Sequence, residues 1–426
     1  MASNFLKSSI VAALLSAVSL PALAVDLEFY FPVAVGGKAA DTISTLTADY
    51  VKAHPDVKID AIYAGSYTDT LTKAITAARG GNAPQISVLL STDMFTLIDE
   101  DLIEPFDGYV SEDEKKSWIG AFYPAFMQNS QTGGKTWGIP FQRSTPVMYW
   151  NKEAFKEAGL DPEHAPENWE ELVEMSKKLV KKDASGNVTQ WGVRIPSAGF
   201  PYWLFQGLST PAGAILANAD GNKTQFDDPK VVEALQYMYD LSNKHGVMQG
   251  GSIDWGATPK AFFEHEAAIV WTTTGNLTNM VANAPFEFGV GFLPKKERFG
   301  APTGGGNFYL FKDASDEQKK AAVDFVKWIT EPEQAAKWSM ATGYVAPRAD
   351  AWETDAMKDY VKTVPQALVA RDQLEYAVAE LSTYENQRVT SFLNDAIAAT
   401  LAGDKEAAPA LKEAQEKAEA VLKNYR

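Results

Sequence analysis

The chain has 426 residues, of which 46% are hydrophobic and 22% are charged, a composition typical of a folded protein of about two to three domains. It carries 39 Lys and Arg against 55 Asp and Glu, a net charge of −16 that disfavours binding to nucleic acid or to an anionic membrane surface. It contains no cysteine, which excludes disulfides, Cys-ligated metal centres and the lipid anchor of a lipoprotein.

The first 24 residues have the pattern of a secretory signal peptide. Lys7 is their only charged residue, residues 10–20 are almost wholly apolar, and the small-residue pattern Ala-Leu-Ala follows at 22–24. A membrane anchor would need an apolar run of roughly 20 residues and would not place Pro21 beside such a pattern. We therefore predict that a signal peptide, residues 1–24, is cleaved and that the mature protein is exported to the bacterial periplasm without a lipid anchor.

Two alternations of strand and helix follow the signal peptide. Strands are expected over 27–31, 57–63 and 85–90, with a helix over 68–78 and an earlier one that carries Ile43, Leu46 and Tyr50 on one face. The last strand is mostly apolar, as is typical of a strand buried in a parallel sheet. This order, βαβαβ, predicts an α/β lobe.

The rest of the chain predicts a second lobe. Apolar residues at helical spacing indicate helices over 168–182 and 228–244, and the second opens with Asp228-Pro229, a favourable helix start. Strands are expected over 146–150, 267–271, 288–292 and 307–311, before a mainly helical C-terminal third that ends in a helix over 408–425. Because the chain has no internal repeat and no long linker, we expect a compact two-lobed body.

No constellation of catalytic or metal-binding residues stands out. No two of the histidines, His54, His164, His245 and His265, have the i, i+4 spacing of helical metal ligands. There is no Gly-x-Ser-x-Gly nucleophile motif, and the glycines at 304–306 lack the Lys-Ser/Thr of a phosphate-binding loop. They do offer bare backbone N–H groups to a ligand. The sequence thus indicates a protein that is not an enzyme, with no catalytic residue, no metal and no cofactor.

Four motifs resemble a known family. They read GNAP at 81–84, PFQRSTPVMYWNKEAF at 140–155, EAGLDP at 157–162, and TGY at 342–344 after the helix that begins EPE at 331–333. In this order and spacing the chain resembles the extracellular solute-binding proteins of the carbohydrate-uptake class (family 1). Within that class it is most similar to the periplasmic sn-glycerol-3-phosphate-binding proteins of ABC importers.

The resemblance implies an α/β fold of the two-lobed periplasmic binding protein kind (type II), with the ligand cleft between the lobes. The first lobe would comprise residues 25–143 and 275–330, and the second residues 144–274 and 331–426. The chain would then cross between lobes near Arg143, Thr274 and Thr330. Closure of the lobes would exclude water from the cleft and strengthen each polar contact there.

The resemblance also implies a set of phosphate-binding residues. Hydroxyls and backbone N–H groups would donate to the phosphate oxygens, and one arginine would supply a charged, planar fork. By position in the family motifs the set falls on Tyr67, Ser144, Thr273 or Thr274, Gly305 or Gly306, Tyr344 and Arg388.

Two further positions concern specificity. The family has a glutamate just after the third strand that accepts hydrogen bonds from the glycerol hydroxyls, whereas this chain has Ser91 there and Asp93 two residues later. The polyol would then be held differently, or the ligand would be larger than glycerol phosphate. Aromatic residues within 199–203, Trp203 above all, could form a wall for a sugar face or a choline-like cation, or could belong to the core.

We therefore expect a periplasmic solute-binding component of an ABC transporter that captures sn-glycerol-3-phosphate or a glycerophosphodiester. Its partners would be this small anionic polyol and a permease in the inner membrane, and we expect a monomer that binds no nucleic acid. The first alternative is a receptor for a neutral or differently charged mono- or oligosaccharide. A more distant alternative is a secreted phosphodiester hydrolase, which would turn over its ligand.

Overall fold

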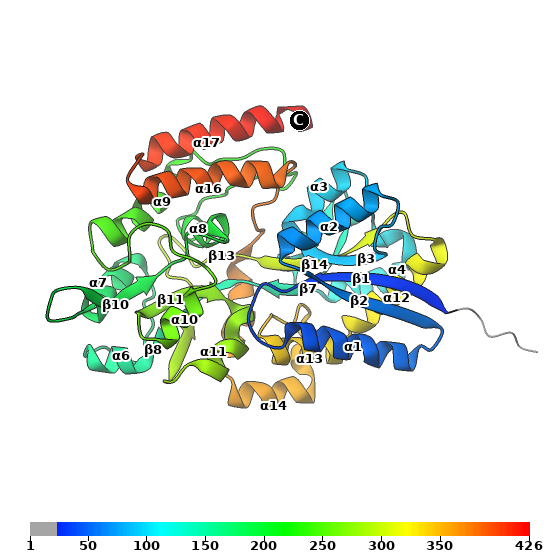
Figure 1. Cartoon of the computed structure of the whole chain (residues 1–426), viewed down its shortest axis with the longest axis horizontal. Coiled ribbons are helices and arrows are strands. Elements are labelled where there is room, and N and C mark those ends of the chain that lie inside the picture. The colour runs from blue at the N-terminus through cyan, green and yellow to red at the C-terminus, as the bar shows by residue number, and fades with distance from the viewer. Residues whose placement is uncertain (1–23) are drawn as a thin grey trace, which may run out of the picture.

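The computed structural model describes residues 24–426, so the predicted signal peptide lies outside the described residues apart from Ala24. Figure 1 shows two lobes, each built around its own β-sheet and covered by helices. None of the helices between residues 24 and 426 has the length and apolarity to cross a bilayer.

The first sheet has six strands. Its strand order is β2 (Val57–Gly65), β1 (Val25–Pro32), β3 (Ile86–Leu90), β14 (Gly304–Phe311) and β4 (Ile103–Glu104), and β7 (Gly138–Ser144) also pairs with β14. The pairs β1–β2 and β1–β3 are parallel, whereas β14 is antiparallel to all its neighbours. β3 and β14 lie in the middle of the sheet. The end of β3 at Leu90 and the start of β14 near Gly305 lie at the edge that faces the second lobe.

The second sheet has five strands. Their order is β12 (Phe288–Gly291), β8 (Pro146–Asn151), β11 (Ala267–Thr273), β10 (Val188–Arg194) and β9 (Lys181–Lys182). β7 ends at Ser144 in the first sheet and β8 begins at Pro146 in the second, so the chain passes between the sheets at Thr145.

The placement of β12 corrects one predicted boundary. Residues 275–330 were expected in the first lobe, but β12 forms an antiparallel ladder with β8 of the second sheet. Its partner strand β8 in turn pairs with β11, and these backbone hydrogen bonds keep the segment in the second lobe until β14 enters the first sheet at Gly304. The other predicted lobe boundaries stay a prediction.

Helices cover both sheets. Those that pack with the first sheet are α1 (Ala39–Ala53), α2 (Tyr67–Arg79), α3 (Met94–Asp99), α5 (Pro124–Met127) and α12 (Asp316–Ile329). The short α4 (Glu112–Ser117) buries no residue and is joined to α12 by the ion pair of Glu114 with Lys327. Those that pack with the second are α6 (Lys152–Glu157), α7 (Trp169–Leu179), α8 (Pro201–Ser209), α9 (Pro229–Asn243), α10 (Thr258–Phe263), α11 (Leu277–Asn283), α16 (Asn386–Ala402) and α17 (Ala407–Leu422). The remaining elements are α13 (Pro332–Thr342), α14 (Asp355–Thr363), α15 (Gln366–Asp372), the pair β13 (Ala301–Pro302) and β15 (Ala377–Val378), and the hairpin β5 (Gln131–Thr132) and β6 (Lys135–Thr136).

The strands and helices predicted from periodicity are present, with one shorter than expected. The predicted helix over 168–182 is α7, which begins after the Asn168 cap and ends at Leu179. Lys181 and Lys182 instead form β9 and pair with β10, where Gln190 donates from its side chain to the Leu179 carbonyl at 2.7 Å. The predicted Asp228 cap is confirmed, since its carboxylate accepts from the Lys230 N–H at 2.8 Å.

An aromatic core fixes the first sheet. Phe29 of β1 and Phe308 of β14 lie with ring centroids 5.4 Å apart, and Phe325 of α12 packs edge-on against Phe29 at 5.8 Å. Phe141 of β7 continues the cluster and stacks on Trp338 of α13 at 4.8 Å. All five rings are fully buried. Such burial contributes about 1.5–3 kcal/mol for each phenylalanine, so the strand that leads out of this lobe is held firmly in place.

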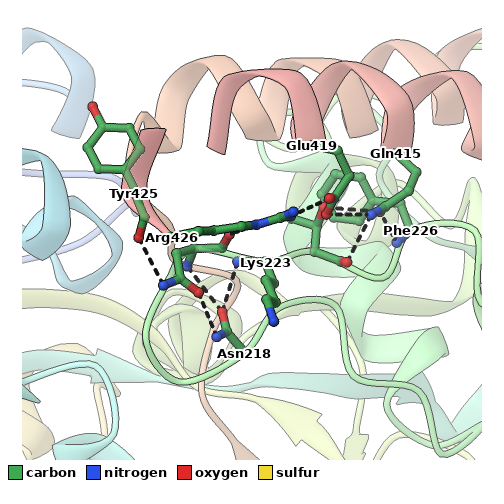
Figure 2. A network of polar contacts seen from close by, with 9 residues as sticks. Asn218, Lys223, Phe226, Gln415, Glu419, Tyr425 and Arg426 are labelled. Carbon is green, nitrogen blue, oxygen red and sulfur yellow. Dashed lines mark hydrogen bonds and ion pairs between the residues drawn. The ribbon is translucent and has the colours of Figure 1, made fainter. Parts of the chain in front are cut away.

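The C-terminal helix is tied to the second lobe by polar contacts. Gln415 of α17 accepts from the Phe226 N–H at 2.7 Å and donates to the Thr224 carbonyl at 2.9 Å (Figure 2). At the chain end, Tyr425 accepts through its carbonyl from the Asn222 amide at 3.0 Å, and its hydroxyl donates to Asp99 of α3 at 2.9 Å. The C-terminus therefore touches the first lobe as well as the second.

Candidate ligand-binding site

A cavity of about 370 Å³, its open mouth included, lies where the two lobes meet. Strand ends, helix starts and loops of both lobes line it. The lining residues are Ala34, Val35, Tyr67, Leu90, Ser144, Phe200, Trp203, Trp255, Thr273, Gly305, Tyr344 and Glu380.

Tyr67 is the first residue of α2, and its position depends on the helix cap. Ser66 accepts from the Asp69 N–H and Asp69 accepts from the Ser66 N–H at 3.0 Å, a reciprocal capping box that fixes the start of the helix. The Tyr67 hydroxyl donates to Gln142 Oε1 of β7 at 2.8 Å. Burial, and next the neighbouring Tyr344, raise the pKa of Tyr67 well above its usual value, so the hydroxyl stays protonated.

Three further hydroxyls line the same cavity. Ser144 and Thr273 are the last residues of β7 and β11, and Thr273 Oγ1 accepts from the Gly275 N–H at 3.1 Å. Tyr344 follows α13, which ends at Gly343 with a positive φ of 90°. Hydroxyls both donate and accept, so this side of the cavity suits phosphate oxygens or sugar hydroxyls.

Glycine is required at the start of β14 for close packing. Gly305 has a φ of +87°, and a Cβ there would overlap the Gln142 carbonyl oxygen. A Cβ on Gly304 would lie 2.6 Å from the Trp203 ring. Gly305 lines the cavity, so the access of a ligand to its bare backbone stays a prediction, whereas Gly304 makes room for the Trp203 ring.

Aromatic rings form the other side of the cavity. Trp255 lies edge-on to Phe200 at 5.6 Å and to Trp203 at 5.8 Å. Trp203 is 5% exposed and donates from its indole N–H to the Thr303 carbonyl at 2.8 Å. The wall expected within 199–203 lines the cavity, and Trp203 belongs both to it and to the core of the second lobe.

A fully buried arginine lies behind the cavity. Arg143 of β7 donates to Asn307 Oδ1 at 2.9 Å and to Thr303 Oγ1 at 3.2 Å, and its guanidinium lies 5.0 Å from the Phe126 ring centre. Burial lowers the pKa of Arg143 to about 10, which still leaves it charged at neutral pH. Its hydrogen-bond partners are neutral, so its charge is not cancelled by direct pairing and supplies positive potential beside Ser144.

Two buried carboxyl groups lie near each other, and one of them, Glu380, faces this arginine. Glu380 lines the cavity and accepts from the Tyr202 hydroxyl at 2.8 Å, and Asp93 follows the end of β3. Burial raises the pKa of Glu380 to about 8 and that of Asp93 to about 7. One carboxylate oxygen of each has no hydrogen-bond partner among the described residues. Both groups therefore resist ionisation in the folded protein.

These carboxyls predict how stability depends on pH. A carboxyl whose pKa is raised on folding binds more protons in the folded state, so its favourable contribution is complete below pH 4 and is lost as pH rises through the folded pKa. Stability of the ligand-free protein should fall between about pH 5 and 8, by up to about 1.4 kcal/mol per pH unit for each group. Asp93→Asn should flatten the slope measured by urea unfolding, whereas the exposed Asp113→Asn should keep it. His245, whose pKa burial lowers, acts in the opposite sense but is common to all three proteins.

The structure brings six of the ten predicted site residues to the cavity: Tyr67, Ser144, Trp203, Thr273, Gly305 and Tyr344. Ser91 is fully buried at the end of β3, and Thr274 is buried beneath Thr273, where it accepts from the Thr145 N–H at 3.3 Å. Gly306 packs against Val88. These three support the cavity from behind.

Arg388 requires a correction, because it does not reach the cavity. It lies exposed on α16, beside a separate surface depression that it shares with Glu385 and Lys417. The buried face of α16 packs on α17 and α8, whereas Arg388 lies on its exposed face. The arginine near the site is Arg143, which the sequence indicated only as a crossing point.

Two residues that line the cavity and could contact a ligand were not predicted from the sequence. Trp255 precedes α10 and Glu380 follows the two-residue strand β15, both in irregular segments without apolar periodicity. A carboxylate directly after a strand is a signal that could have singled out Glu380. Among 55 acidic residues that signal has little weight.

Residues 45–366 match the model of the bacterial extracellular solute-binding protein family. The chain belongs to this family. It is 30% identical over 384 residues to the sn-glycerol-3-phosphate-binding periplasmic protein UgpB of Yersinia pestis bv. Antiqua, a match that covers 86% of this chain and 84% of the relative. The UgpB of Pectobacterium atrosepticum is 29% identical over 366 residues, with 82% and 80% covered.

Solved structures of the family have the same architecture. The crystal structure of UgpB from Mycobacterium tuberculosis in complex with glycerophosphocholine superposes with a TM-score of 0.81 at 20% identity and covers 94% of this chain and 99% of that one. The cyclic alpha-maltosyl-1,6-maltose binding protein of Arthrobacter globiformis gives a TM-score of 0.80 at 26% identity, with 94% and 100% covered. The predicted two-lobed solute-binding fold is confirmed, and this solute-binding protein resembles relatives that are named for binding and not for catalysis.

Proposed function

We propose that this solute-binding protein captures a glycerophosphodiester in the periplasm and delivers it to an ABC permease. The relatives named for sn-glycerol-3-phosphate and the neighbour crystallised with glycerophosphocholine support a glycerol phosphate ligand. In this proposal the protein acts as a monomer, after cleavage of its signal peptide, with no lipid anchor and no enzymatic activity. The protein would trap its ligand between the lobes without converting it.

The observation that carries the proposal is the two-sided lining of the cavity. One side has the hydroxyls of Tyr67, Ser144, Thr273 and Tyr344 together with the backbone of Gly305. Neutral donors of this kind bind phosphate oxygens, and the positive charge of the buried Arg143 lies close behind them. Because no cationic side chain of residues 24–426 lines the cavity, the phosphate is held by many dipoles, from which it can be released to a transporter.

The aromatic side favours a diester over glycerol-3-phosphate itself. Phe200, Trp203 and Trp255 offer ring surface that a three-carbon phosphate ester has no group to cover. A second substituent on the phosphate would occupy this side. The replacement of the family glutamate by a buried Ser91 points the same way, since that carboxylate is absent from the end of β3.

A neutral saccharide is the second candidate. Aromatic rings stack on sugar faces, and Glu380 could accept from sugar hydroxyls. The neighbour from Arthrobacter globiformis, named for a cyclic maltosyl sugar, supports this alternative.

Calorimetric titration of the mature, ligand-stripped protein separates these candidates. Glycerophosphocholine, sn-glycerol-3-phosphate and maltose would each be titrated, and we expect the tightest binding with the diester. Binding to maltose alone would contradict the proposal and establish the sugar candidate. Recovery of unaltered glycerophosphocholine after long incubation is expected, and release of choline or glycerol would instead identify a hydrolase.

Trp255→Ala tests the aromatic side directly. Trp255 lies half-buried in a loop, so its removal should spare the core, while the cavity loses a ring that closes one wall. We expect affinity for the diester to fall by about 30-fold, the effect of a contact of roughly 2 kcal/mol. Trp137→Ala, at a partly buried ring of the first lobe outside the cavity, is the control and should bind as the wild type does. Equal affinities of the two variants would contradict the role of the aromatic side.

A further inference from the structure

Glu380 lines the cavity and has one buried carboxylate oxygen without a hydrogen-bond partner among the described residues. The side chain is only 4% exposed. Oε1 accepts from the Tyr202 hydroxyl at 2.8 Å, whereas Oε2 has no partner among the described residues. A buried acceptor without a partner costs free energy. A ligand group that interacts with it would recover that cost.

The backbone at this position is fixed from both sides. The Glu380 N–H donates to Asn129 Oδ1 at 2.8 Å, and the Glu380 carbonyl accepts from Asn129 Nδ2 at 3.0 Å. The Asn129 carbonyl accepts in turn from Asn307 Nδ2 at 3.0 Å. A carboxylate held in this way loses little freedom when a ligand binds, which is the condition for a selective contact.

The charges around Glu380 leave it uncompensated. Arg143 is the cation that faces it, but the guanidinium donates to Asn307 and Thr303. Asp93 lies on the other side and is itself acidic. The remaining titratable neighbours are the phenols of Tyr202, Tyr67 and Tyr309, which are neutral. An added positive charge would therefore be stabilised here.

The aromatic rings of the cavity favour the same kind of group. Phe200, Trp203 and Trp255 line the cavity together with Glu380. The faces of aromatic rings carry negative potential and bind alkylammonium groups, most strongly when water is excluded. Glu380 and the rings thus offer a cation both a counter-charge and an apolar surround.

We propose that Glu380 is the counter-ion for an alkylammonium group at one end of the ligand and makes the cavity selective for zwitterionic glycerophosphodiesters over sn-glycerol-3-phosphate. This inference rests on the proposed function and deepens it. The phosphate lies at the hydroxyl side, and the ammonium group lies between the rings and Oε2. Both choline and ethanolamine diesters have this chemistry.

Proton release follows from this role. Burial raises the pKa of Glu380 to about 8, so the group is largely protonated in the empty cavity at neutral pH. A cation beside it stabilises the carboxylate, and the proton leaves to the buffer as the ligand binds. Ligands without a cation give no such release, because a phosphate nearby favours the protonated form.

Calorimetry tests the proposal at pH 7 in two buffers that differ in ionisation enthalpy. The wild-type protein would be titrated with glycerophosphocholine, glycerophosphoethanolamine and sn-glycerol-3-phosphate. We expect release of close to one proton with each diester and none with the monoester. Glu380→Gln should abolish the release and lower the ratio of diester to monoester affinity at least about tenfold. The control Glu375→Gln, at an exposed position of the same segment, should keep both.

The outcomes are distinguishable. Diester binding without proton release, or with an unchanged affinity ratio in Glu380→Gln, would overturn the counter-ion role and leave the proposed function in place. Absence of binding by all three phosphate ligands to the wild-type protein would overturn the proposed function and the counter-ion role together. The proton count is measured on the wild type, so it decides the question even if the variant fails to fold.

Discussion

Arg143→Met should lower the free energy of unfolding by about 3–6 kcal/mol, because two buried acceptors each lose a hydrogen bond from a charged donor, at about 1.5–3 kcal/mol for each. The side chain is fully buried, and its two hydrogen bonds reach Asn307 and Thr303 of the β13–β14 segment. Methionine has comparable length but leaves both acceptors short of a donor. It also removes the cation that faces Glu380, so the pKa of that carboxyl should rise further.

Urea unfolding of three variants separates the buried charge from general effects of losing an arginine. Arg371 also lies over a ring, that of Trp352 at 5.5 Å, but it is partly exposed and should cost less than about 1 kcal/mol when changed to methionine. The double variant Arg143→Met/Glu380→Gln should be more stable than Arg143→Met, because the unpaired carboxyl is gone. Equal losses in Arg143→Met and Arg371→Met would show that Arg143 does not hold the lobe contact together.

Periodicity predicted those helices and strands in which the pattern of buried residues is set by the local sequence. β3 and α9 have their apolar residues at the spacing of a buried strand and of a helix face, and both occur at the expected positions. The assignment of β12 could not be predicted in this way. A four-residue strand fits either sheet by its composition, and only its ladder with β8 decides the matter.

The site was predictable where a family motif reaches it. Ser144 and Tyr344 lie within motifs of distinctive spacing, and both line the cavity. Arg388 fails because the charge of a side chain says nothing about the face of the helix it occupies, and here that face is exposed. The choice between Arg143 and Arg388 depends on burial, which contacts between distant segments determine.

Glu380, too, could not be predicted from its local sequence. Its environment includes Tyr202, Asn129 and Arg143. Tyr202 is 178 residues away along the chain, and the other two are farther. The raised pKa comes first from burial by these segments and not from any neighbour in sequence. Carboxylates of this kind are recognised only after the lobes are assembled.

Gly305→Ala should cost more than about 3 kcal/mol of stability, because two effects add. The residue has a φ of +87°, and this alone costs an L-residue about 1–2 kcal/mol. The new methyl group would also overlap the Gln142 carbonyl oxygen, which belongs to backbone and cannot turn aside as a side chain does. β14 and β7 must then separate at the point where Gly305 pairs with Arg143.

Gly81→Ala provides the matched control for this variant. Gly81 has a similar φ of +76°, but no atom lies within 4 Å of a Cβ built there, so it should cost only about 1–2 kcal/mol. The difference between the two variants in urea unfolding isolates the steric contact at the lobe junction. Because separation of β14 from β7 moves Ser144 away from the cavity, Gly305→Ala should also weaken diester binding at least about tenfold, while Gly81→Ala should not. If both variants lose the same stability and keep their affinity, the close approach of the two strands at Gly305 has no part in ligand binding.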